Sequence, residues 1–332
     1  MMDNYGFYTG KSFDAYEFFG CHTDENGAVF RVFAPAAVRI SVIGEFNGWQ
    51  DTPMNKIGDG NFWAVYIEGV KPGQMYKYKI YKPDGSCMDH CDPYGYGMEL
   101  RPASASIVRN LYGYEFQDDA WMKRRSNGVA SALNIYEIHA GSWKKPQNGW
   151  YRYDELATQL VPYLKEYGYN YIELLPIGEH PCDESWGYQC SGFYSPTSRY
   201  GTLDDYKKMI DILHHNDIGV IMDFVPVHFA LDAYALAKFD GTALYEYPHK
   251  DVGNSEWGSC NFMHSRGEVR SFLQSCANYW LKEYHVDGLR MDAISNMIYW
   301  QGNPARGVNK DAVVFLQNMN VCPPLKRVPR RT

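Results

Sequence analysis

Four short apolar runs, each followed by a segment of helical periodicity, restrict the fold of this sequence more than any other feature. The runs cover 133–138, 171–175, 219–227 and 286–293. The helical segment after the second run opens with Thr202 and Asp205 in the positions of a capping box. Strands that alternate with helices form a parallel sheet. We therefore expect residues 133–320 to contain about four βα units.

Parallel sheets of this kind occur in doubly wound folds and in (β/α) barrels. The doubly wound, nucleotide-binding fold would place a glycine-rich phosphate loop after the first strand, and the sequence has none there. We therefore expect a partial TIM barrel, with its active site at the carboxyl ends of the strands. A complete barrel has eight strands and about 250 residues, so this region corresponds to about half of one.

The first 116 residues have a different periodicity. Apolar and polar side chains alternate at 38–42 and at 76–80, as in strands with one buried face. Turn-forming pairs separate the apolar runs: Asn47-Gly48, Asp59-Gly60, Pro72-Gly73 and Asp84-Gly85. We expect residues 1–116 to form an immunoglobulin-like β-sandwich, joined to the barrel region by a polar and basic linker at 117–132.

Composition limits the classes of ligand that this chain is expected to bind. The net charge of −7 offers no basic surface for phosphates, which argues against nucleic acids and anionic membranes as partners. The 28 Tyr and 9 Trp, many of them in polar stretches with glycine, favour a sugar. Cys87, His90 and Cys91 have no second pair at zinc-site spacing, so we expect no metal and no cofactor. The start lacks the features of a signal peptide, which predicts a cytoplasmic protein.

Charged side chains follow two of the predicted strands. Asp223 and His228 come at the end of the third strand, and Arg290 and Asp292 at the end of the fourth. Residues two apart on a strand point to the same face, so Arg290 and Asp292 can touch. The pair is either a structural ion pair or a nucleophilic carboxylate held in its charged form by a cation.

Aromatic side chains suggest where a sugar would bind. A long loop after the second strand contains Trp186, Tyr188 and the stretch 193–196, which together are too polar for core. This loop is either a rim on which sugar rings stack or an aromatic segment packed against the sandwich. Trp49 and Trp63 are the corresponding candidates in the sandwich, although tryptophan in a small sandwich usually belongs to the core.

Several stretches resemble a known family. Residues 223–228 and 288–293 resemble two of the sequence regions shared by the α-amylase clan, glycoside hydrolase family 13. Within this clan the chain resembles the 1,4-α-glucan (glycogen) branching enzymes, which are glycosyltransferases of glycogen biosynthesis. The stretches that carry this likeness are 30–35, 44–49, 136–143, 186–189 and 191–202. The similarity extends from about residue 15 to about residue 320.

The resemblance implies a carbohydrate-binding sandwich of the glycogen-binding type, followed by a TIM-barrel catalytic domain. It implies that Asp292 is the nucleophile and Arg290 its orienting partner. It places Asp223, His228 and Tyr188 around the transferred sugar.

The same resemblance adds Trp186 and His139 to the substrate-binding residues, and it implies α-glucans such as glycogen and amylose as partners. Retention of the anomeric configuration fits this assignment, because a double displacement needs a carboxylate nucleophile.

The chain also departs from the family pattern. The family's general acid is a Glu after the fifth barrel strand, and a His-Asp pair follows the seventh; the sequence stops before either. Residues 321–332 contain three prolines and four basic residues, and we interpret them as an aberrant tail produced by a frameshift or an assembly error. We expect this first half of a branching enzyme to be inactive, and either poorly soluble or dependent on a missing partner chain because of its open sheet edge.

Internal glutamates could in principle replace the missing acid. We expect each of them to be a surface or capping residue: Glu173, Glu179, Glu184, Glu256 and Glu283. Two other functions stay open. One is a debranching hydrolase of the same clan, and the other is a non-catalytic protein that binds glycogen.

Overall fold

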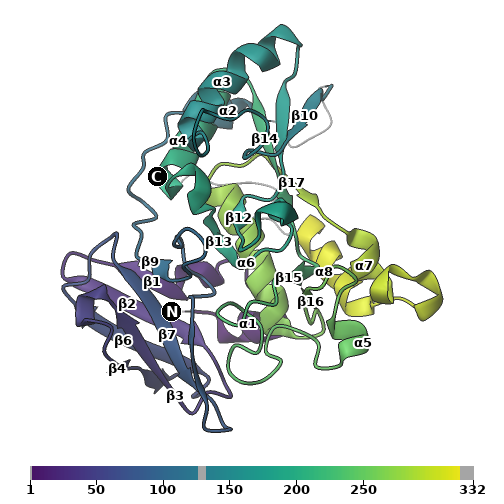
Figure 1. The fold of residues 1–332 in the computed structure, drawn as a ribbon. Coiled ribbons are helices and arrows are strands. Elements are labelled where there is room, and N and C mark those ends of the chain that lie inside the picture. The colour runs from purple at the N-terminus through teal and green to yellow at the C-terminus, as the bar shows by residue number, and fades with distance from the viewer. Residues whose placement is uncertain (1, 126–131, 322–332) are drawn as a thin grey trace.

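The computed structural model describes residues 2–125 and 132–321. Its N-terminal part is built from two antiparallel sheets (Figure 1). One has the order β1 (Gly20–Thr23), β2 (Gly27–Phe33), β6 (Phe62–Glu68), β5 (Asn55–Ile57). The other has the order β4 (Thr52–Pro53), β3 (Arg39–Gly44), β7 (Met75–Tyr81), β8 (Cys87–His90), and β9 (Ser106–Ile107) also pairs with β7. The predicted sandwich is confirmed.

The alternating sequence of β7 explains its place in the sandwich. Tyr76, Tyr78 and Ile80 are buried, whereas the lysines between them are only partly covered. Both tyrosine hydroxyls donate to Oδ2 of the buried Asp92, at 2.8 and 2.9 Å. The strand therefore contributes apolar area and also provides hydrogen bonds to a buried carboxyl group.

A parallel sheet with the order β10 (Ile135–Ile138), β11 (Tyr171–Leu174), β14 (Gly219–Phe224), β17 (Gly288–Met291) forms the second part. The helices that follow these strands are α3 (Tyr153–Glu166), α4 (Leu203–His215), α6 (Gly267–Glu283) and α8 (Lys310–Val321). Thr202 and Asp205 form the predicted capping box at the start of α4. The four βα units are confirmed, and β10 and β17 are the outer strands of the sheet within the described residues.

Short elements fill the connections. They are α1 (Asn4–Thr9), α2 (Asp119–Arg124), α5 (Lys250–Gly253), α7 (Ile294–Ile298), β12 (Gly178–Glu179), β13 (Gly192–Pro196), β15 (His228–Phe229) and β16 (Cys260–Asn261). The linker predicted at 117–132 thus contains a helix, and 126–131 lie outside the described residues. The tail predicted at 321–332 also lies outside them, apart from the last backbone position of α8. In the described parts of the chain, no helix is long and apolar enough to cross a membrane.

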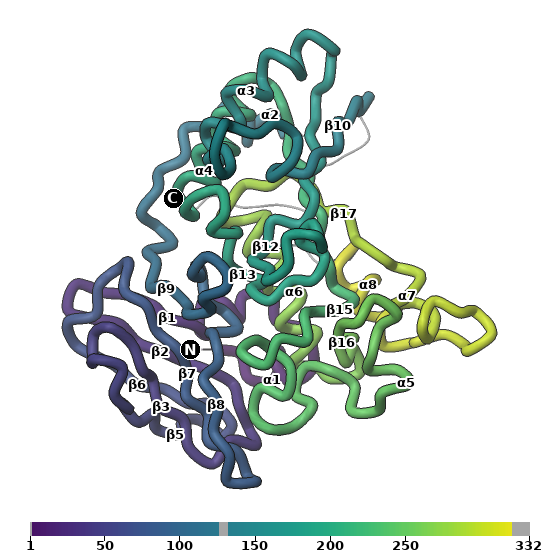
Figure 2. The backbone as a smooth tube through the Cα atoms, viewed as in Figure 1, coloured from purple at the N-terminus to yellow at the C-terminus, as the bar shows by residue number. Residues whose placement is uncertain are grey.

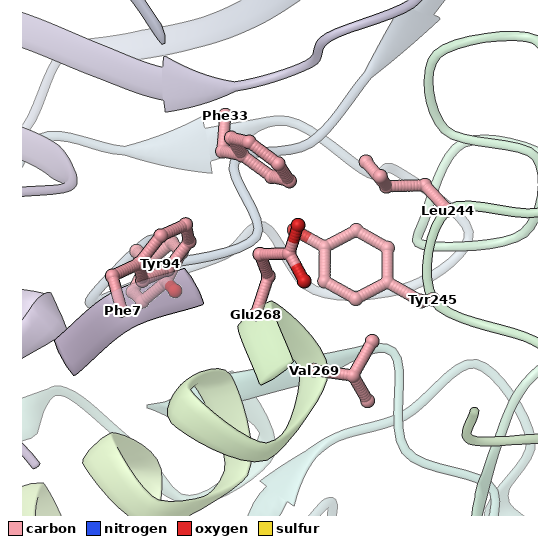
Figure 3. Close-up of a pocket in the computed structure, with 7 residues that line it drawn as sticks. All are labelled: Phe7, Phe33, Tyr94, Leu244, Tyr245, Glu268 and Val269. Carbon is pink, nitrogen blue, oxygen red and sulfur yellow. The ribbon is translucent and has the colours of Figure 1, made fainter. Parts of the chain in front are cut away.

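The N-terminal segment joins the two parts. Helix α1 lies along α6, as the tube in Figure 2 shows. Polar side chains of α6 bind its backbone: Ser271 Oγ donates to Phe7 O at 2.8 Å, and Asn278 Nδ2 donates to Phe13 O at 2.8 Å. A pocket at this joint is drawn in Figure 3, lined by Phe7, Phe33, Tyr94, Leu244, Tyr245, Glu268 and Val269. The sandwich and the barrel region therefore share one hydrophobic core.

A buried histidine fixes the segment before the barrel to the amino-terminal side of the sheet. His214 Nδ1 lies 2.7 Å from Asp118 Oδ2, and its Nε2 lies 3.0 Å from Asp287 Oδ2. Burial on its own would lower the pKa of His214, but the hydrogen bonds to Asp118 and Asp287 outweigh burial and raise it. His285 also contacts Asp118, at 2.9 Å. The ring of His214 thus holds together α4, α2 and the entry to β17.

Replacement of this histidine should change how stability depends on pH. A raised folded-state pKa stabilises the protein below the ordinary histidine pKa, and this contribution disappears as the pH rises through the folded value. We expect His214→Gln to lower the free energy of unfolding at pH 6 by about 3 kcal/mol, and by less at pH 8.5. Urea midpoints at the two pH values measure this. His215→Gln is the control, because its side chain is half exposed; equal losses in both variants would contradict the assignment.

Candidate active site

Two neighbouring parallel strands bring the charged residues together. β14 pairs with β17 so that Asp223 lies opposite Arg290, and Asp292 follows directly after β17. Arg290 Nη1 donates to Asp292 Oδ1 at 2.8 Å and to Asp223 Oδ2 at 3.1 Å. The expected contact between Arg290 and Asp292 is present, and the same guanidinium also binds the second carboxylate. The cluster lies at the carboxyl ends of the strands, where barrel enzymes have their active sites.

The two carboxylate oxygens of Asp223 differ in their hydrogen bonding. Tyr188 Oη donates to its Oδ2 at 2.6 Å, while the buried Oδ1 has no hydrogen-bond partner among the described residues. Burial raises the pKa of Asp223 to about 6, although Tyr188 and Arg290 act in the opposite direction. A nearly buried carboxylate with an unsatisfied oxygen is unfavourable in the free protein and suited to accept a hydroxyl.

His228 forms the next wall of the cluster. It is buried at the start of β15, and its Nδ1 lies 2.8 Å from Ser259 Oγ. Burial lowers the pKa of His228 to about 4, so the ring is neutral near pH 7. Its ring centre lies 5.2 Å from that of Trp257, a residue that the sequence analysis missed. Its position in a polar, glycine-containing stretch, 254–260, is the sequence feature that could have indicated it.

The aromatic loop divides into two parts. Trp186 is 55% exposed and stacks on His139, with ring centres 6.0 Å apart. Phe193 and Tyr194, in contrast, are buried in β13, and the ring centre of Tyr194 lies 4.9 Å from that of Tyr94 in the sandwich part. The prediction that 193–196 is too polar for core is wrong, because side chains of α6 bind its carbonyls and the domain joint covers its rings.

A buried ion-pair network anchors this loop. Arg199 Nη1 lies 2.7 Å from Glu179 Oε1, and Arg199 Nη2 lies 2.6 Å from Asp183 Oδ1. Arg101 also pairs with Asp183. The prediction that Glu179 is a surface or capping residue is wrong, because Glu179 is the buried partner of Arg199. The network fixes Asp183, which begins the turn leading into Trp186.

The two tryptophans of the sandwich differ in exposure. Trp49 is 40% exposed and follows a glycine turn. Trp63 is 4% exposed, and its Nε1 donates to Ala34 O at 3.0 Å. The assignment of Trp63 as a glycan contact is corrected, since its ring belongs to the core between the sheets. Trp49 stays a candidate.

The described residues contain no group of three or more His, Cys, Asp or Glu side chains arranged to hold a metal ion. At the Cys/His grouping noted in the sequence, Cys87 is exposed, whereas His90 and Cys91 are buried. His90 Nδ1 lies 2.9 Å from Ala235 O, and its ring packs on Phe239. Packing therefore accounts for this histidine.

Comparisons with known proteins agree with this architecture. Residues 18–95 match carbohydrate-binding module 48, the isoamylase N-terminal domain, and residues 156–251 match the alpha amylase catalytic domain. The 1,4-alpha-glucan branching enzyme GlgB of Fusobacterium nucleatum is 45% identical over 96% of this chain and 52% of its own length. The GlgB of Bacillus caldolyticus is 45% identical over 96% of this chain and 49% of its own.

The chain is homologous to the GlgB branching enzymes. It spans about half the length of the curated relatives it matches. Among solved structures, a protein from Salmonella typhimurium aligns with a TM-score of 0.71 at 26% identity, over 91% of this chain and 47% of that one. A pullulanase from Bacillus acidopullulyticus aligns with a TM-score of 0.66 at 23% identity, over 83% of this chain and 38% of that one. This likeness supports the fold alone. The chain thus has a module 48 sandwich followed by a partial amylase-type barrel.

The raised pKa of Asp223 predicts a stability gain on neutralisation. Ionised Asp223 destabilises the folded state at pH values above about 6, and this penalty disappears as the pH falls toward the ordinary aspartate pKa. We expect Asp223→Asn to stabilise the protein by about 2 kcal/mol at pH 8 and by much less near pH 4. Denaturant unfolding at both pH values measures the difference.

Asp183→Asn is the matched control with the opposite sign. Hydrogen bonds from Arg101 and Arg199 hold the pKa of Asp183 well below its usual range, so neutralisation should destabilise the protein at pH 8. If both variants lowered the stability at pH 8, the view of Asp223 as a strained functional carboxylate would be wrong.

Proposed function

We propose that this chain binds α-1,4-glucans and carries the nucleophile-bearing part of a 1,4-α-glucan branching site, as used in glycogen biosynthesis. The observation that supports this most is the contact of one guanidinium, Arg290, with both Asp292 and Asp223. The homology to GlgB branching enzymes favours branching over debranching. The exposed Trp49 in the module 48 sandwich provides a second place for a glucan to stack.

The proposed reaction is a double displacement at the anomeric carbon. A carboxylate oxygen of Asp292 attacks C1 while the bond from C1 to the glucosidic oxygen breaks, and a general acid protonates that oxygen. The 6-hydroxyl of an acceptor glucan then attacks C1, and the deprotonated general acid, now acting as a base, takes its proton. The bond from C1 to Asp292 breaks in this step, which releases the carboxylate. Arg290 orients the attacking carboxylate through the bond at 2.8 Å. Two inversions give the retained configuration.

The residues around the nucleophile are proposed to hold the sugar. Asp223 accepts a sugar hydroxyl through its unpaired Oδ1, and the neutral His228 donates to another. The ring of Tyr188 lies against the sugar, with its hydroxyl held by Asp223. Trp186 and His139 contact the glucan farther from the reacting bond. We also propose a cytoplasmic location, with no nucleic-acid or membrane partner.

A polypeptide of these 332 residues has, in our proposal, the nucleophile without the general acid. We expect it to give no branching, so that amylose incubated with it keeps its iodine spectrum. A shift toward the spectrum of a branched glucan would contradict this expectation. Glu256→Gln would then be the first variant to test, because Asn296, which follows the nucleophile by four residues, donates to Glu256 Oε1 at 3.3 Å.

Glucan binding should persist without catalysis. We expect the chain to be retarded in native gels that contain glycogen, and Trp49→Ala to lose a large part of this retardation because a stacked ring is removed. Tyr167→Ala, which removes an even more exposed ring just after α3, is the control. A wild-type chain that migrates equally with and without glycogen would refute the proposed function.

A further inference from the structure

The hairpin at 254–260 presents an exposed tryptophan that the proposed mechanism does not use. Asn254 and Cys260 form an antiparallel bridge, and Ser255 N donates to Ser259 O at 2.9 Å. Trp257 is at the tip of this hairpin and is 43% exposed. The turn is closed by Gly258, whose φ of 71° is in the region that favours glycine.

This hairpin is rigid rather than loosely attached. The hydroxyls of Ser255 and Ser259 lie 2.5 Å apart, and Trp257 N donates to Ser255 Oγ at 3.2 Å. Gln189 Nε2, from the loop that carries Tyr188, donates to Trp257 O at 3.0 Å. The backbone of Trp257 is therefore fixed on both sides, so the exposure of its ring is a property of a well-held position.

The surroundings of Trp257 connect it to the sugar pocket. Its ring is tilted by 38° against His228, which Ser259 of the same hairpin also contacts. Gln189 directly follows Tyr188, whose hydroxyl binds Asp223. The buried and unpaired Oδ1 of Asp223 is a separate sign that a polar ligand belongs in this pocket.

Trp257 has a counterpart three residues upstream of Gln189. Trp186 is 55% exposed and stacks on His139, just as Trp257 packs on His228. Each indole thus has one face or edge supported by an imidazole and the rest open. A ring preorganised in this way loses little freedom when a flat apolar face of a sugar covers it.

We propose that Trp257 is a stacking platform for a glucosyl residue of an α-1,4-glucan, as a second platform beside Trp186. This assignment rests on the proposed function and makes it more specific, because it adds a contact that selects an oligosaccharide over a single glucose. A chain long enough to reach both rings gains from both, whereas glucose covers one at most.

Maltoheptaose binding to the whole 332-residue chain tests the proposal, with isothermal titration calorimetry as the readout. The Trp49→Ala variant serves as background, since it removes the proposed sandwich contact. In this background we expect Trp257→Ala to raise the Kd about tenfold and Trp257→Phe to raise it less than threefold. Tyr167→Ala, in the same background, should leave the Kd unchanged.

A chemical measurement on the unaltered protein avoids dependence on the folding of variants. N-bromosuccinimide oxidises exposed indoles, and peptide mapping reports each tryptophan separately. We expect maltoheptaose to slow the oxidation of Trp257 at least fivefold. If maltoheptaose slows the oxidation of Trp49 and leaves that of Trp257 unchanged, the proposal is overturned.

The remaining outcomes are also decisive. If the Trp49→Ala background binds no maltoheptaose while the wild-type chain does, the cleft has no platform and the inference fails, although glucan binding by the sandwich stands. Stacking by this ring is also rejected if Trp257→Ala leaves the Kd of the Trp49→Ala background unchanged. Equal losses of affinity in the Trp257→Ala and Trp257→Phe variants reject it as well. A wild-type chain that binds neither glycogen nor maltoheptaose rejects the proposed function together with the inference.

Discussion

The register between β14 and β17 is the constraint on which the candidate site depends. Parallel pairing places Asp223 opposite Arg290, and the two-residue spacing then turns Asp292 to the same side as Arg290. The backbone N–H of Asp292 donates to Phe224 O at 2.9 Å, so the pairing continues past the end of the strand to Asp292, the proposed nucleophile. A shift of one residue would direct Arg290 away from both carboxylates. The backbone hydrogen bonds between the two strands therefore determine which side chains meet in the cluster.

The loops that complete the site are held by interactions from outside the barrel region. Arg101 lies between β8 and β9 of the sandwich part, and it shares Asp183 with the buried Arg199. Helix α1 and the residues that follow it bind α6 through their backbone carbonyls. A charge buried as deeply as that of Arg199 is tolerated only with paired carboxylates, so removal of either partner leaves an unpaired charge. The sandwich is thus part of the support of the active-site loop, in addition to any role in binding glucan.

The sequence predicts this fold well because its elements are locally consistent. The period-two pattern at 76–80, the glycine turns, and the capping box of Thr202 and Asp205 each depend on neighbouring residues alone. The contact of Arg290 with Asp292 is predictable for the same reason. The burial of Glu179 and of Tyr194 is not, because it depends on residues far away in the chain, Arg199 and the aromatic rings of the sandwich part. The misassignment of Trp63 has the same origin, since exposure of a strand residue depends on which sheet covers it.

Function in this site is linked to unfavourable electrostatics in the free protein. Asp223 is ionised at neutral pH against the effect of burial, and one of its oxygens has no partner among the described residues. His228, in the same cluster, is kept neutral by burial, so it adds no compensating positive charge. Arg290 is the only cation described in contact with Asp223 or Asp292, and it is shared between the two. A neutral sugar that donates a hydroxyl to Asp223 satisfies the free oxygen without adding charge, whereas an anionic ligand would increase the repulsion. The electrostatics of the cluster are therefore consistent with the neutral glucan proposed as its ligand, and this argument does not use sequence similarity.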